Sequence, residues 1–205
     1  NLTEIINPDN SHTSYSYDQA GRVTTVTFID QNQIQHSVVI SIQYDPANNP
    51  LVVNYGNNTT ITNSYDQNHM YRLINKVTVN SLGVHLQDLS YIYDSVGNIT
   101  MITDASNTPT AKTSNYVYDD LDRLTYAMIT NSANGQNYNQ NFTYDALGNI
   151  SNGPAGQYTY TSSQNTYSNP HAATQIGSTK ISYDRAGNIT TENSSAMNNI
   201  TYYQW

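Results

Sequence analysis

The sequence contains no cysteine, so neither disulfide bonds nor thiolate metal sites hold the fold. Basic residues are scarce as well: 7 Lys and Arg stand against 15 Asp and Glu, which gives a formal net charge of −8. Nucleic acids and anionic membrane surfaces are bound through basic patches, so this balance argues against both as partners. No apolar run approaches the ~20 residues of a transmembrane helix, and we expect no membrane span.

Phenylalanine is nearly absent, with 2 residues against 19 tyrosines. A tyrosine ring is apolar, but its hydroxyl needs a hydrogen-bond partner or water. The composition therefore predicts sheet faces that are half dry and half hydrated, without a thick apolar core. Because the chain has no initiating Met and stops at Trp205 without a closing signal, we expect it to be a part of a larger protein.

A short motif built on Tyr-Asp recurs along the chain. It reads YDQAGRVT at 17–24, YDSVGNIT at 93–100, YDALGNIS at 144–151 and YDRAGNIT at 183–190, and further Tyr-Asp pairs begin at 44, 65 and 118. The period is about 26 residues, which is typical of a repeat architecture. The last gap is longer, and we interpret QYTYTSSQNTY at 157–167 as the remains of an eighth unit. The predicted repeat motif consists of Tyr17, Asp18, Gly21, Tyr44, Asp45, Tyr65, Asp66, Tyr93, Asp94, Gly97, Tyr118, Asp119, Tyr144, Asp145, Gly148, Tyr183, Asp184 and Gly187.

Each unit has the pattern of a β-hairpin. Apolar residues alternate with others before the Tyr-Asp pair, as in 91–93, and again after the turn, as in 99–102, which favours strands. Asp suits the first position of a type I turn, and Gly three residues later supplies the positive φ that such a hairpin connection needs. Asn48 and Asp122 replace this glycine in two units, and the unit at 65–73 carries two extra residues, so its loop is expected to be longer.

The fold class predicted from these units is all-β: repeated antiparallel β-hairpins in one long curved sheet. Seven units of two strands imply roughly 14 strands. We expect residues 1–205 to form one array of about seven to eight repeats.

The pattern Y-D-x-x-G-[NR]-[LI]-T resembles the YD repeat of the Rhs family, which includes bacterial Rhs polymorphic toxins, the C component of insecticidal toxin complexes and the teneurins. The resemblance runs from about Tyr15 to the end of the chain. It implies a sheet that spirals into a hollow shell around a C-terminal toxin domain, in a secreted or surface protein of a bacterium. This chain would form an arc of such a shell. Its partners would be the rest of its own shell and the enclosed toxin. The family's self-cleavage segment is missing, since the only Asp-Pro pair, at 45–46, belongs to a YD turn.

Sequence motifs for catalysis, cofactors or metals are lacking. There is no nucleophile elbow, phosphate-binding glycine loop or zinc-binding histidine motif, so we predict neither an enzyme nor a cofactor. The five histidines (His12, His36, His69, His85, His171) share no ligand spacing and are interpreted as surface or loop residues. The aspartates are interpreted as turn caps rather than as acids or calcium ligands.

Two functional classes therefore stay open. The first is a structural segment of a toxin-enclosing shell. The alternative is a binding module whose tyrosine-rich strands contact a carbohydrate or a cell-surface receptor. Because the terminal strands of stacked hairpins lack partners, we also expect the isolated chain to self-associate.

Overall fold

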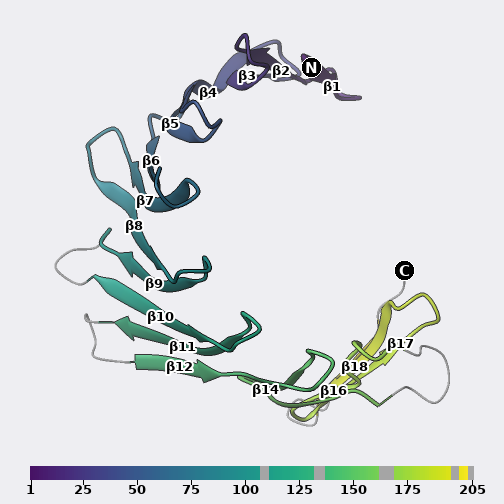
Figure 1. The fold of residues 1–205 in the computed structure, drawn as a ribbon. Helices are drawn as coiled ribbons and strands as arrows, with labels where there is room; N and C mark the ends of the chain where they lie inside the picture. Colours follow the sequence, from purple (N-terminus) through teal and green to yellow (C-terminus); the bar gives the residue numbers. More distant parts are fainter. Residues whose placement is uncertain (107–110, 132–136, 162–168, 195–198, 203–205) are drawn as a thin grey trace. The chain divides into compact units, whose positions relative to one another are not determined.

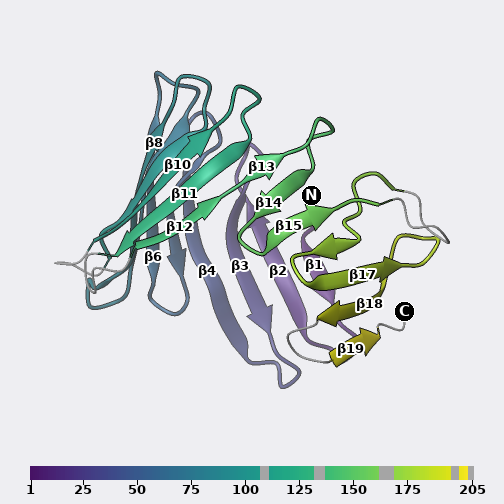
Figure 2. The ribbon, with the colours of Figure 1, turned by 90° about the horizontal axis from the view of Figure 1, so that it is seen from below.

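The structure is a computed structural model that describes residues 1–106, 111–131, 137–161, 169–194 and 199–202. In these residues the chain is all-β and antiparallel, which confirms the predicted fold class. The strands follow one another in sequence order within two open sheets, one of twelve strands and one of seven (Figure 1). Figure 2 shows how consecutive strands of the first sheet lie side by side.

The first sheet consists of β1 (Glu4–Ile6), β2 (His12–Tyr17), β3 (Val23–Ile29), β4 (Gln35–Tyr44), β5 (Pro50–Tyr55), β6 (Thr60–Asp66), β7 (Arg72–Val79), β8 (His85–Tyr93), β9 (Ile99–Asp104), β10 (Lys112–Tyr118), β11 (Leu124–Asn131) and β12 (Asn137–Asn141). The second consists of β13 (Thr143–Tyr144), β14 (Ile150–Gly153), β15 (Gly156–Thr159), β16 (Gln175–Ile176), β17 (Thr179–Tyr183), β18 (Ile189–Ser194) and β19 (Asn199–Tyr202).

The strand number differs from the roughly 14 strands in one sheet that the repeat count predicted. The division into two sheets falls at Phe142, the single residue between β12 and β13. The N–H of Phe142 still donates a hydrogen bond to the carbonyl oxygen of Thr125, at 2.9 Å. The interruption is therefore one residue long, and the extra strands are short pieces that hydrophobic alternation does not reveal.

The YD turns connect the two strands of each repeat with the predicted geometry. In the first, the N–H of Gly21 donates to the carbonyl oxygen of Asp18 at 3.0 Å, and the N–H of Asp18 donates to that of Arg22 at 2.9 Å. Gly21 has a φ of 81°, as expected for a type I turn followed by a left-handed residue. Asn48 and Asp122 occupy the same position with φ of 70° and 58°. Their substitution for glycine therefore leaves the turn type unchanged.

The turns at the other ends of the strands in the first sheet have the same geometry but different residues. The turn between β3 and β4 begins at Asp30 and has Gln33 in the left-handed position, with a φ of 63°. The turn between β7 and β8 begins at Asn80 and has Gly83 there, with a φ of 74°. The same turn type therefore connects strands at both of their ends in this sheet.

A second irregularity follows the YD turns. In the first repeat Tyr17 pairs with Val23 while Ser16 pairs with Thr25, so that Thr24 is an extra residue in the returning strand. Such a β-bulge bends the strand and increases its twist. The register shifts place the extra residue at Thr24, Leu51, Ile74, Thr100, Ser151 and Thr190.

Few side chains in the described residues are fully covered. The buried apolar residues are Val53 and Ile181, and no large side chain is completely buried. This agrees with the expectation that a thick apolar core is absent. Backbone pairing and side-chain hydrogen bonds therefore connect the repeats.

The chain forms two compact units. One comprises Asn1–Asn115 with Ile129–Asn137, and the other comprises Tyr116–Met128 with Tyr138–Trp205. The described residues contain no helix long and apolar enough to cross a membrane.

Candidate functional site

The candidate site is the junction between consecutive repeats, where the turn of one hairpin meets the next. The motif aspartate organises each turn. One carboxylate oxygen of Asp18 accepts the backbone N–H groups of Ala20 and Arg22, both at 2.9 Å. The other accepts the Arg22 side chain, with Nε at 2.7 Å. An Asp at the start of a turn therefore closes its own loop, as predicted.

The residue after the left-handed position determines what the second carboxylate oxygen binds. Where it is asparagine, its amide donates to the aspartate, as Asn149 does to Asp145 at 2.9 Å. Asn49, Asn98 and Asn188 do the same in their own turns. In the long loop after Tyr65 this residue is Arg72, which donates to the Asp94 carbonyl oxygen, and His69 Nδ1 lies 2.7 Å from the Asp66 carboxylate instead.

These contacts lower the pKa of all seven motif aspartates. The pKa of Asp18 is lowered chiefly by the backbone N–H of Arg22, and the pKa of Asp119 chiefly by the side chain of Arg123. At Asp45 burial raises the pKa, but hydrogen bonds from Asn49 outweigh this and the net pKa is lowered. The aspartates are therefore ionised at neutral pH, which suits turn caps rather than general acids.

The motif tyrosine connects its repeat to the preceding one. The hydroxyl of Tyr44 donates to the carbonyl oxygen of Val23 at 2.7 Å, and that of Tyr93 donates to the carbonyl oxygen of Leu73 at 2.7 Å. In each case the acceptor lies in the returning strand, directly before the bulge. The same bond joins Tyr65 to Pro50 at 3.2 Å and Tyr144 to Leu124 at 2.7 Å. Tyr183 and Tyr17 also donate to backbone carbonyl oxygens, those of Ala173 at 2.8 Å and of Leu2, but these acceptors lie outside the strands. Tyr118 ends β10, directly before the turn that Asp119 opens.

Arginine at the turn exit adds a second connection between repeats. Besides binding Asp18, Arg22 donates through Nη1 to the carbonyl oxygen of Asp45, at 3.2 Å. Its guanidinium also lies 4.7 Å from the centre of the Tyr44 ring, a cation–π contact. Arg123 lies in the same way 4.5 Å from the ring of Tyr144. The arginine thus ties its own turn to the motif tyrosine of the next repeat.

The degenerate unit near the C-terminus keeps the tyrosine and changes the turn. Tyr160 donates to the carbonyl oxygen of Ile150 at 3.0 Å, which is the bond of a motif tyrosine. Asn169 takes the place of the aspartate, because its side chain accepts the N–H of His171 at 2.8 Å. The amide of Asn149 reaches this turn, with Nδ2 bound to the Pro170 carbonyl at 2.9 Å and Oδ1 2.6 Å from Nδ1 of His171. Residues 162–168 of this unit lie outside the described residues.

The other histidines lie beside carboxylates. His12 pairs with Glu4 at 3.8 Å, His36 with Asp30 at 3.4 Å, and His85 with Asp88 at 2.9 Å. Within the described part of the chain no three histidine or acidic side chains group as a metal site would require.

Sequence reasoning identified the turns but missed the bonds between repeats. The signals were present: the motif carries Asn or Arg after the left-handed residue, and the tyrosine hydroxyl needs a partner. Their targets lie about 20 residues away in the sequence, as at Tyr44 and Val23, and only the register of the strands reveals them.

These features define a class of protein: an array of antiparallel hairpin repeats whose turns are closed by an aspartate and whose motif tyrosines donate to backbone carbonyl oxygens of the repeat before. The family model described as RHS Repeat matches residues 1–31, so this part of the chain is similar to that family.

Relatives and solved structures support the same class. Toxin subunit YenC1 of Yersinia entomophaga is 29% identical, in a match that covers 66% of this chain and 17% of YenC1. The crystal structure of TcdB2-TccC3-Cdc42 has the same fold, with a TM-score of 0.71 and 21% identity over 94% of this chain and 12% of that one. The Photorhabdus luminescens Tc holotoxin pore gives a TM-score of 0.62 with 19% identity, over 94% of this chain and 11% of that one. The resemblance to the YD-repeat family is confirmed, and the chain spans less than a fifth of these relatives.

Proposed function

We propose that this chain is a structural segment of a β-sheet shell that encloses a C-terminal toxin or effector domain of a secreted Rhs-type protein. The observation that carries the proposal is the junction between repeats. The hairpins of Tyr44, Tyr93 and Tyr144 are each bound to the one before by a hydrogen bond from the tyrosine hydroxyl to a backbone carbonyl oxygen, a contact that lets the array extend by adding repeats. The fold of the toxin-complex structures supports this assignment.

The exposure of apolar side chains also supports a role within a larger assembly. Val38, Ile40 and Ile92 are on strands of the first sheet, yet between 44% and 50% of each remains exposed. A sheet normally covers its apolar face with a second layer of structure. In a shell, the enclosed domain or other shell segments would supply that layer.

The proposal gives residues 1–205 a structural role rather than a catalytic one, and it treats them as one repeat array. Its partners are the rest of the shell and the enclosed domain. The relatives belong to bacterial toxin complexes, which supports an extracellular location. The alternative of a module that binds carbohydrate or a receptor requires a defined binding pocket, and the loop of the third YD repeat borders one.

Limited proteolysis of the full-length protein tests the proposal. We expect the gene to continue beyond Trp205 into a further domain that resists protease in the intact protein. Replacing Gly97 by Val would strain a turn in the shell and make that domain cleavable at lower protease concentration. Leu82→Ala, at a position 84% exposed, is the control and should leave protection unchanged. A following domain cleaved equally in all three proteins would refute enclosure.

A further inference from the structure

The third YD repeat has a connection unlike the others. Its loop forms two successive turns, with His69 N–H bound to the Asp66 carbonyl and Arg72 N–H bound to the His69 carbonyl, both at 3.3 Å. Met70 and Tyr71 follow each other with φ of 60° and 54°. The left-handed conformation is disfavoured for residues with a Cβ, and backbone strain of this kind gathers at functional sites.

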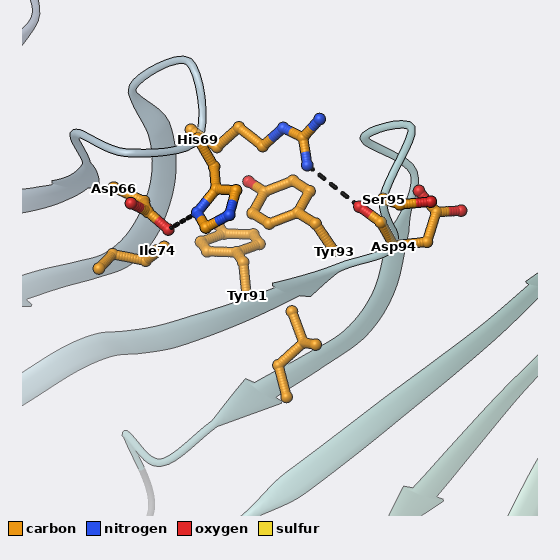
Figure 3. Close-up of a pocket in the computed structure, with 9 residues that line it drawn as sticks. Asp66, His69, Ile74, Tyr91, Tyr93, Asp94 and Ser95 are labelled. Atoms are coloured by element: carbon orange, nitrogen blue, oxygen red, sulfur yellow. Dashed lines mark hydrogen bonds and ion pairs between the residues drawn. The ribbon is translucent and has the colours of Figure 1, made fainter.

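This loop and the following hairpin form a pocket of about 370 Å³ within the compact unit that contains Asn1–Asn115 (Figure 3). Its lining includes Asp66, His69, Arg72, Tyr91 and Tyr93. Figure 3 shows His69 next to the rings of Tyr91 and Tyr93, with the loop on one side and the turn at Asp94 on the other. The longer loop therefore brings an imidazole into the same pocket as two tyrosine rings.

Two polar groups of the pocket have hydrogen-bonding capacity left. The carboxylate of Asp66 only accepts hydrogen bonds, so His69 Nδ1 at 2.7 Å carries the hydrogen and Nε2 stays available. The hydroxyl of Tyr91 binds no group in the described part of the chain. Burial raises the pKa of this phenol, which keeps it protonated.

The charged groups of the pocket are already paired. Arg72 Nη1 donates to the carbonyl oxygen of Asp94 at 3.1 Å, and the guanidinium lies 5.6 Å from the centre of the Tyr93 ring. The Asp94 carboxylate accepts three backbone N–H groups of its own turn. A neutral ligand with an apolar face and several hydroxyl groups fits these surroundings better than an ion.

We propose that this pocket binds a neutral saccharide of one or two pyranose rings. The C–H face of the sugar packs against the tyrosine rings, while its hydroxyls donate to His69 Nε2 and exchange hydrogen bonds with the Tyr91 hydroxyl. This site goes beyond the proposed function and does not depend on it, because a repeat array can enclose a domain whether or not it carries a sugar site.

The experiment is a binding screen by saturation-transfer NMR with the 205-residue chain. The probes are the methyl glycosides of glucose, galactose, mannose and N-acetylglucosamine and the corresponding β-linked disaccharides. We expect saturation transfer to at least one probe. Titration should then show that Tyr91→Phe and His69→Ala each weaken binding by about fivefold or more. Tyr91→Phe keeps the ring, and the His69 side chain is 70% exposed, so both variants should fold.

Tyr15→Phe is the matched control. Tyr15 lies two residues before Tyr17, as Tyr91 lies before Tyr93, but no extended YD loop precedes it. This variant should bind the sugar like the wild type. Absence of saturation transfer to every probe would overturn the proposal, and so would equal loss of affinity in Tyr15→Phe and Tyr91→Phe.

Discussion

Replacement of Gly97 by Ala separates the strain of a turn from the contact between two repeats. Gly97 has a φ of 112°, and a Cβ at this position would lie 3.0 Å from Nη2 and 3.2 Å from Cζ of Arg72. Alanine there would therefore strain its own backbone and also displace the arginine of the preceding repeat. Gly83 is the matched control in the same compact part of the chain, 1–115. It has a φ of 74°, but a Cβ added there would meet no atom within 4 Å.

The magnitudes follow from the contacts. A residue with a Cβ in the left-handed region costs about 1–2 kcal/mol, and we expect Gly83→Ala to reduce the free energy of unfolding by this amount. Gly97→Ala should cost about 1 kcal/mol more, because the hydrogen bond from Arg72 to Asp94 and the cation–π contact with Tyr93 are lost. Urea unfolding followed by far-ultraviolet circular dichroism measures both variants.

A double-mutant cycle with Arg72→Ala isolates the contact. Once the arginine side chain is removed, Gly97→Ala costs only the strain of its own backbone. The double variant should therefore be about 1 kcal/mol more stable than the sum of the single effects indicates. The effects of Gly83→Ala and Arg72→Ala should add. Additivity of Gly97→Ala with Arg72→Ala would show that the turn and the neighbouring repeat are not coupled through this arginine.

Four further predictions concern other features. Tyr144→Phe should lower the free energy of unfolding by about 1 kcal/mol in urea titrations, because it removes the hydrogen bond to Leu124. Tyr15→Phe removes a hydroxyl that binds no group within the described residues and should change this free energy little. Equal losses in the two variants would contradict the role of the bond to Leu124. The motif aspartates have lowered pKa values in the folded state, so their stabilisation is present above the unfolded pKa of about 3.9 and is lost as pH falls through the folded value. The midpoint temperature of thermal unfolding should accordingly be constant between about pH 7 and 5 and fall below about pH 4. A fall in this temperature that began near neutral pH would contradict the assignment. Gln33→Gly should raise the free energy of unfolding by about 0.5 kcal/mol, because glycine relieves the left-handed strain at a φ of 63° and loses part of the gain to chain entropy; a destabilised variant would disagree. The isolated chain should associate through its unpaired edge strands, and light scattering that gives a constant mass of 22.9 kDa at all concentrations would exclude this.

The turns were the most predictable part of the fold, because their chemistry is local. Asp18 and Gly21 carry both the hydrogen-bond acceptor and the positive φ within four residues. The same reasoning placed Asn48 and Asp122 in the left-handed position correctly. The longer loop after Tyr65 was also evident, since two inserted residues cannot fit the shorter turn.

The bulges and the junctions between repeats were not predictable in the same way. Alternation of side chains at 23–26 predicts a strand there, but it does not show that Thr24 lacks a partner. The partner of a tyrosine hydroxyl depends on how far the neighbouring hairpin is displaced along the sheet, and no local pattern records that displacement. The break at Phe142 was missed for a related reason, since one residue without strand pairing leaves the hydrophobic alternation intact.

The acceptor at each junction is a backbone oxygen, and every amino acid supplies one. Val23, Pro50, Leu73, Leu124 and Ile150 serve equally well, so the tyrosine places no demand on the side chain of the repeat before it. A gene encoding such an array can duplicate, lose or exchange repeats without matching mutations in the neighbours. The unit around Tyr160 illustrates this freedom: it has lost its Tyr-Asp pair and its turn glycine, yet it still connects to the repeat that precedes it.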